Sequence, residues 1–260
     1  MSLCEIIDFH THPFLDCNDN LCKYKDLMDM TPENTMEDIK RAGISKFCGS
    51  VIKPMTPDFS AFREANREAL KLQELYDGNY IPGFQICPNF IEESIEEIDF
   101  AHKCGVNLIG ELVPYMHNWE DYSCQEFSCL LDHIEKYDMV VSVHTTNFEQ
   151  MKNMAKSHPN IRFVFAHPGE KANIEKHIEI MGEFDNVFLD ISGTGIIRYG
   201  MLKKLVTGVG AERILFGTDY PICNPAVYIN GVLGEKISDR EKEMIFSVNA
   251  KNLLKYDITK

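Results

Sequence analysis

The chain has 260 residues, of which 44% are hydrophobic, and 26 Lys and Arg against 40 Asp and Glu give a net charge of −14. That length suits one large core, and a surface this acidic repels nucleic acid and anionic membranes. No apolar run reaches the roughly 18 residues that a membrane span needs, and we see no leader pattern. The nine cysteines are odd in number and form no Cys-X-X-Cys pair. We therefore expect a reduced, soluble, cytoplasmic protein.

Short apolar runs bounded by turn residues recur along the whole sequence. They are rich in Val, Ile and Phe and apolar on both faces, which is typical of strands that are covered on both sides. The runs are 4–12, 46–54, 80–88, 106–114, 139–146, 162–169, 187–194 and 213–221. Helical spacing of apolar residues lies between them, at 59–76, 91–102, 124–137, 148–157, 172–181, 201–207 and 238–254. The last of these opens with Ser-Asp-Arg-Glu, a capping-box pattern.

Eight strands alternating with helices predict a (β/α)8 TIM-like barrel that forms a single domain over residues 1–260. An open doubly wound sheet is the alternative, but no glycine-rich phosphate turn follows the first strand. One long polar connection stands out at 13–34. It is either a lid over the site or a surface excursion with a short helix at 23–28.

Polar side chains stand at the ends of several predicted strands. His10 and His12 end the first run, and on a strand their side chains share one face. Later runs end in Glu111, His144, His167 and Asp219. A carboxylate inside a buried strand needs a partner, and a closed barrel brings Asp219 beside the two histidines of the first strand. Imidazoles and carboxylates together predict a metal site.

The combination of motifs resembles the amidohydrolase superfamily, most closely its family 2 branch of metal-dependent hydrolases and decarboxylases. The motifs are Asp-Phe-His-Thr-His at 8–12, His144, Ala-His-Pro-Gly at 166–169, Phe-Gly-Thr-Asp-Tyr-Pro at 216–221 and Asn-Ala-Lys-Asn-Leu-Leu at 249–254. The resemblance spans residues 8–254 and implies a distorted barrel with a divalent metal, most often zinc, and a metal-bound water. It also implies metal or catalytic roles for His10, His12, His144, His167 and Asp219. Many relatives carry Lys where this chain has Glu111.

A metal-activated water and a carboxylate that moves protons suit the hydrolysis of an amide, ester or lactone of a small molecule, and we favour this reaction. Asp219 is the expected acid–base, and His167 would polarise the substrate or hold the water. The acidic Glu111 weighs against a substrate carboxylate that is to be expelled. A decarboxylase acting on a small unsaturated or aromatic acid is the alternative. An inactive metal-binding scaffold is weaker, because every ligand position is filled.

The presence of Glu111 leaves open whether the site binds one metal ion or two. We expect it to ligate a metal, and with two oxygens it could bridge two ions. His10, His12 and Asp219 would hold one ion, and His144 and His167 the other. With one ion only, His144 joins the pair from the first strand, and His167 and Glu111 lie behind the ligands. A plain ion pair between Glu111 and a loop Lys or Arg is the simpler alternative.

Substrate contacts are expected from three residues that follow strands two, four and seven. They are Lys53, Tyr115 and Arg198. The two cations would suit a carboxylate or phosphate, although residues of these types in such places are more often ordinary loop residues. The expected partner is a small molecule, and a homodimer is compatible with the sequence.

Overall fold

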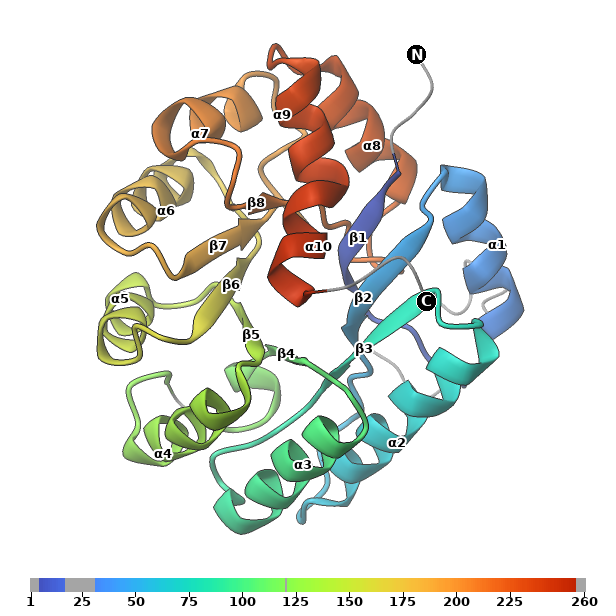
Figure 1. Ribbon diagram of the computed structural model, residues 1–260, viewed down its shortest axis with the longest axis vertical. Coiled ribbons are helices and arrows are strands. Elements are labelled where there is room, and N and C mark those ends of the chain that lie inside the picture. The colour runs from blue at the N-terminus through green and yellow to red at the C-terminus, as the bar shows by residue number, and fades with distance from the viewer. Residues whose placement is uncertain (1–4, 17–30, 120, 256–260) are drawn as a thin grey trace.

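The protein, seen in a computed structural model that describes residues 5–16, 31–119 and 121–255, forms one sheet of eight parallel strands. The strands stand in chain order and a helix follows each of them (Figure 1). Their bounds are β1 Ile7–Thr11, β2 Lys46–Ser50, β3 Tyr80–Phe84, β4 Leu108–Leu112, β5 Val140–His144, β6 Arg162–Ala166, β7 Val187–Asp190 and β8 Ile214–Leu215. This order is the one that repeated right-handed βα units produce.

The sheet closes because the segment after β8 returns to β1. Tyr220 pairs in parallel with Thr11, and the Phe9 amide donates to the Phe216 carbonyl at 2.8 Å. The Asp219 amide donates to the His10 carbonyl, also at 2.8 Å. The predicted (β/α)8 barrel is therefore confirmed, and its last polar residue lies beside its first histidines as expected.

Within the described residues, ten α-helices lie around the barrel and across one of its ends (Figure 1). Those that surround the strands are α1 Pro32–Ala42, α2 Ser60–Leu75, α3 Ile91–Lys103, α4 Gln125–Ile134, α5 Phe148–Ser157, α6 Lys171–Glu183, α7 Met201–Val209 and α8 Pro225–Gly234. The chain ends in α9 Asp239–Glu243, a π-helical turn Met244–Val248 and α10 Asn249–Leu254. The capping box of Ser238 and Glu241 forms at the start of α9.

Two helices were missing from the sequence-based prediction. The first, α1, starts at Pro32 after the Thr31 hydroxyl accepts from the Asn34 amide, and it ends at Gly43 with φ 90°. Its first turn falls inside the predicted lid 13–34, so that prediction was too long at this end. Residues 17–30 of the lid, with the helix expected at 23–28, lie outside the described residues. The second, α8, is apolar on several faces and has no clean helical stripe.

All eight strands are shorter than predicted, and for β7 and β8 the structure gives a local reason. The expected strand 187–194 stops at Asp190 because the Asp190 carboxylate accepts the Ser192 amide in a turn. The expected strand 213–221 keeps only two residues as strand, since the Phe216 amide donates to Ile245 of the C-terminal helix. Both strands therefore end early and leave irregular chain at the carboxyl end of the barrel, where side chains can turn inward.

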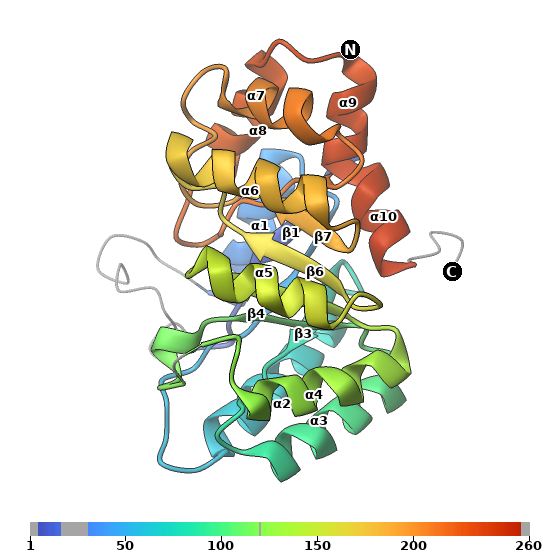
Figure 2. The ribbon, with the colours of Figure 1, turned by 90° about the vertical axis from the view of Figure 1, so that its left-hand side faces the viewer.

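The amino end of the barrel is filled by apolar side chains. Residues of β1, β2, β4, β5, β6 and β8 form an inner cluster with Ala250, Leu253 and Leu254 of α10. Figure 2 shows α10 at the end of the barrel from which the strands start. A polar site is therefore confined to the opposite, carboxyl end. Among the described residues, no helix has both the length and the apolar character needed to cross a membrane.

His117, a buried histidine outside the barrel interior, should make the stability of the fold depend on pH. His117 follows the 3-10 turn Pro114–Met116 and is 3% exposed. Its ring packs against Phe62 of α2, with 4.8 Å between the centroids, and its Nδ1 has no partner within the described residues. Burial disfavours the charged imidazole and lowers the pKa of His117 from 6.5 to about 4.

Acidification should therefore weaken the fold through His117. Between roughly pH 8 and pH 5 the unfolded histidine takes up a proton and the folded one does not, which costs about 2 kcal/mol of unfolding free energy. Urea unfolding at the two pH values should show this loss of unfolding free energy in the wild type, and the loss should be absent in H117Q. The exposed His102, changed to Gln, is the control. An unaltered pH dependence in H117Q would contradict the prediction.

Candidate metal centre

The two histidines of β1 meet at the carboxyl end of the barrel. The Nε2 atoms of His10 and His12 are 3.1 Å apart, and both rings are buried, with 2% and 5% exposed. Asp219 approaches from the end of β8 and places Oδ1 3.7 Å from His10 Nε2 and 3.6 Å from His12 Nε2. Backbone hydrogen bonds between β1 and the chain after β8 hold the three residues together.

The hydrogen bonds behind the two rings decide which nitrogens carry protons. His10 Nδ1 lies 2.9 Å from Asp190 Oδ2, and His12 Nδ1 lies 3.0 Å from the Ser50 carbonyl oxygen. Both partners can only accept, so in the neutral rings each Nδ1 carries the proton and each Nε2 is a bare acceptor. The Nε2 atoms of both rings thus converge with the side-chain oxygens of Asp219 and Glu111.

Glu111 stands at the centre of a polar cluster that it forms with His10, His12, His144, His167 and Asp219, and it is 5% exposed. Its Oε2 faces the first pair of rings, 3.3 Å from His10 Nε2 and 3.4 Å from His12 Nε2. Its Oε1 faces the second pair, 2.8 Å from His144 Nδ1 and 3.3 Å from His167 Nε2. Within the described residues its charged partners are thus histidines and not a loop Lys or Arg.

The electrostatics of the cluster favour a positive charge at its centre. Burial opposes protonation of His10, but the carboxylates of Asp190 and Glu111 outweigh it and raise the pKa of His10 well above its usual value. Burial likewise opposes ionisation of Glu111, yet the neighbouring imidazoles hold its pKa well below the usual value. A buried set of acceptors that draws in a proton so strongly is suited to a cation.

Three overlapping sets of side chains bring their ligand atoms within 4.8 Å of one another. The sets are His10, His12 and Glu111; His10, His167 and Asp190; and Glu111, His144 and His167. The side chains therefore fit a divalent ion. The exposed fraction of the side chain rises from 2% at His10 to 23% at His144. The cluster thus runs from the closed interior toward the mouth.

Polar residues with no predicted role support these side chains. The fully buried Asp8 accepts from the amides of His10 and Thr218, at 3.1 and 3.0 Å. Burial raises the pKa of Asp8 to about 7, against the hydrogen bonds from Thr218. Asp190 and Ser192 lie in the expected strand 187–194 and were given no role there. For Asp8, its place two residues before His10 on the same strand is the signal that could have found it.

The three predicted substrate residues lie in different surroundings. Tyr115 is 66% exposed and sets its ring edge-on to His144, with 5.3 Å between the centroids. Lys53 Nζ lies 2.8 Å from Glu68 Oε2, in a pair that is nearly buried. Arg198 is exposed and 3.1 Å from Glu170. Of these three interactions, the ring contact of Tyr115 with His144 is the one that reaches the polar cluster.

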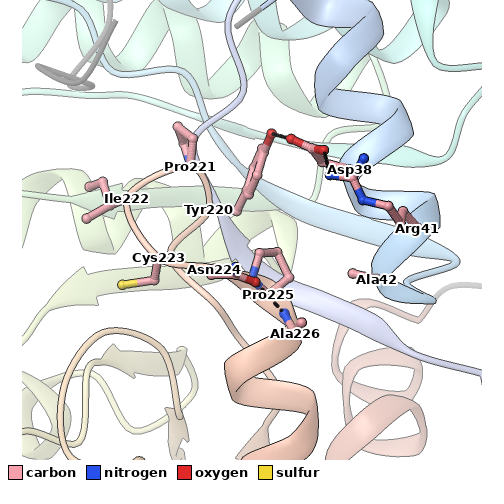
Figure 3. A pocket seen from close by; sticks show the side chains of 10 residues that line it. All are labelled: Asp38, Arg41, Ala42, Tyr220, Pro221, Ile222, Cys223, Asn224, Pro225 and Ala226. Carbon is pink, nitrogen blue, oxygen red and sulfur yellow. Dashed lines mark hydrogen bonds and ion pairs between the residues drawn. The ribbon is translucent and has the colours of Figure 1, made fainter. Parts of the chain in front are cut away.

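A cavity of about 560 Å³ lies outside the cluster, between α1 and the loop after β8 (Figure 3). Tyr220, the neighbour of Asp219, crosses it and donates from its hydroxyl to Asp38 of α1 at 3.0 Å. Arg41 pairs with the same carboxylate. No histidine lines the cavity, so we place the candidate active site at the cluster of imidazoles and carboxylates.

Fold and cluster together define a (β/α)8 barrel with a divalent metal centre at its mouth. Residues 7–256 match the family model described as "Amidohydrolase". The chain belongs to this amidohydrolase family and is an enzyme of that family. The resemblance drawn from the sequence motifs is confirmed. No curated protein matches the sequence.

Solved structures share the fold over nearly the whole chain. A 2,6-dihydroxybenzoate decarboxylase from Rhizobium is 15% identical, with a TM-score of 0.75 over 97% of this chain and 99% of that one. A dihydroxybenzoic acid decarboxylase from Polaromonas sp. JS666, with bound manganese and 2-nitroresorcinol, is 15% identical, with a TM-score of 0.76 over 97% of both chains. The 5-carboxyvanillate decarboxylase LigW from Sphingomonas paucimobilis is 11% identical, with a TM-score of 0.74 over 98% and 100%.

These similarities correct the predicted reaction. The sequence favoured hydrolysis because Glu111 was expected to repel a substrate carboxylate, but the structures similar to this chain are mostly decarboxylases, with a 4-oxalomesaconate hydratase among them. The physical reason for the error is that Glu111 is not a free charge: both of its oxygens face imidazoles. The manganese in the Polaromonas enzyme likewise leaves the predicted zinc unconfirmed.

Addition of a divalent ion to chelator-stripped protein should raise its melting temperature. The ion binds the folded cluster and not the unfolded chain, so at 100 times its dissociation constant it adds about 2.7 kcal/mol of stability. Differential scanning fluorimetry with Mn²⁺ and Zn²⁺ measures this effect, and Na⁺ at equal ionic strength is the control. No shift with either divalent ion would contradict a metal centre.

Proposed function

We propose that the protein is a metal-dependent decarboxylase of a small aromatic or unsaturated carboxylic acid. The observation that supports this most is the cluster around Glu111, set at the mouth of a fold that known decarboxylases share along their length. A buried site of this kind attracts an anionic substrate only if a cation offsets its carboxylates.

His10, His12, Glu111, His144 and Asp219 would hold the ion or ions, with His167 as a ligand of a second ion or as a catalytic group. When bound, the metal supplies positive charge that offsets the carboxylates and attracts the carboxylate of the substrate. Zinc is the prediction from the sequence, and manganese is equally compatible with imidazole and carboxylate ligands.

Asp219 is the proposed proton carrier. Its side chain is 11% exposed, so it faces both the cluster and the mouth. In the reaction the Asp219 carboxyl gives a proton to the ring or alkene carbon that bears the substrate carboxylate. The bond from that carbon to the carboxylate then breaks, its electron pair returns to the unsaturated system, and CO₂ leaves. Asp219 regains a proton from water at the mouth.

Tyr115 is the proposed contact for the apolar part of the substrate, and its exposed ring beside His144 supports this role. Lys53 and Arg198 remain proposed contacts for a second anionic group. Each would first have to exchange its carboxylate partner, Glu68 or Glu170, for the substrate. We therefore expect Tyr115 to affect substrate binding more than either cation.

Decarboxylation should depend on Asp219. In a panel of hydroxybenzoic and dienoic acids, the metal-loaded wild type should release CO₂ and place one solvent deuterium on the product carbon. D219N should lose at least about a hundredfold in kcat, since the proton carrier is removed. The exposed D185N is the control and should match the wild type. Full turnover in D219N, or no CO₂ from any acid, would contradict the proposal.

Metal stoichiometry should depend on Glu111. We propose that its two oxygens bridge two ions, so elemental analysis of the saturated wild type should give two divalent ions per chain. E111Q should retain one at most, because an amide is a poor bridging ligand. E97Q removes a buried carboxylate that pairs with Arg67 away from the mouth, and is the control. One ion in both the wild type and E111Q would refute the bridge.

A further inference from the structure

Asp190 at the end of β7, together with Ser192, forms hydrogen bonds to the Nδ1 atoms of His10 and His167. Asp190 is fully buried, and its Oδ2 lies 2.9 Å from His10 Nδ1. Its Oδ1 accepts from the Ser192 amide at 2.9 Å and from the Ser192 hydroxyl. The same hydroxyl oxygen lies 2.9 Å from His167 Nδ1. One carboxylate and one hydroxyl therefore join a ring on β1 to a ring that follows β6.

When both rings are neutral, as metal binding requires, the donors and acceptors of this hydrogen-bonded chain can be assigned in one way. The Asp190 carboxylate only accepts, so the single hydroxyl proton of Ser192 lies toward Asp190. The lone pairs of Ser192 Oγ then face His167, and His167 Nδ1 must donate to them. By the same logic His10 Nδ1 donates to Asp190. Both rings are thereby left with Nε2 unprotonated and turned toward Glu111, at 3.3 Å in each case.

Two glycines leave the space that this arrangement needs. A Cβ on Gly193, which has φ 66°, would come within 2.5 Å of His167 Nδ1, the atom that Ser192 contacts. A Cβ on Gly217 would come within 2.9 Å of the Cβ of His10 and 3.2 Å of Asp190 Oδ1. The chain thus approaches both rings closely on their hidden side, at distances that any larger residue would disturb.

We propose that Asp190 and Ser192 are positioning residues that set the protonated nitrogen of His10 and His167 together, so that both Nε2 atoms are ready to bind metal. The consequence for catalysis rests on the proposed function, but the tautomers themselves do not. Asp190 acts on both rings, one directly and one through Ser192. Ser192 acts on His167 alone. This difference between Asp190, which acts on two rings, and Ser192, which acts on one, separates positioning from packing. A residue that only packs would not determine which ring nitrogen carries the proton.

The test is imidazole ¹⁵N NMR on protein labelled at histidine and loaded with diamagnetic Zn²⁺, compared with the metal-free protein. In the wild type, His10 and His167 should each show a proton on Nδ1 that exchanges slowly with water. S192A should lose that signal at His167 and keep it at His10. S192T retains a hydroxyl and should restore it. D190N should alter both rings and lower Zn²⁺ affinity, by about 10- to 100-fold.

S94A is the matched control. Ser94 is also fully buried, and its hydroxyl bonds to the backbone of Cys87, away from the cluster. Its removal should leave both imidazole signals and the Zn²⁺ affinity unchanged. A neutral His167 ring that carries its proton on Nε2 and not on Nδ1, or unchanged rings in S192A, would overturn the proposal. Because no measurement here uses turnover, a failure to find decarboxylation would count against the proposed function only.

Discussion

The site depends on a negative charge held where the barrel admits almost no water. Glu111 is 5% exposed and sits on β4 between apolar neighbours. A carboxylate there is costly unless positive charge or hydrogen-bond donors surround it. Four imidazoles from three different parts of the barrel face its two oxygens. When these rings are neutral, most of them turn acceptor nitrogens inward, and a divalent ion bound there would supply the positive charge that Glu111 needs.

Closure of the barrel brings these side chains together, and irregular backbone aims them. Asp219 and His167 follow their strands in the left-handed region, with φ 68° and 67°. Such a conformation costs on the order of 1–3 kcal/mol for a residue with a side chain. At Asp219 it coincides with the backbone hydrogen bond to His10, which joins the two ends of the sheet. The same turn that closes the barrel therefore presents the proposed proton carrier.

The reversal from hydrolase to decarboxylase shows how little a ligand set says about the reaction. Imidazoles and carboxylates around a divalent ion can attract a neutral carbonyl or an anionic acid. The argument from charge repulsion treated Glu111 as a free anion beside the substrate. In the structure its charge is already shared among the rings, so it does not by itself exclude a carboxylate from the mouth.

The sequence by itself determined the barrel, the positions of the strands and the strand-end residues. A parallel strand that is buried on both faces must be apolar along its length, so a polar residue at its end is visible without a structure. Helix α1 and the true ends of β7 and β8 were missed because they depend on caps and on hydrogen bonds to other parts of the chain. Helix α8 was missed because it is apolar on several faces. Only the tertiary structure decided what lies behind the ligands. Asp190 and His10 are 180 positions apart, and no local pattern encodes a hydrogen bond across that separation. The proton positions of the rings, and with them their readiness for metal, follow from such contacts.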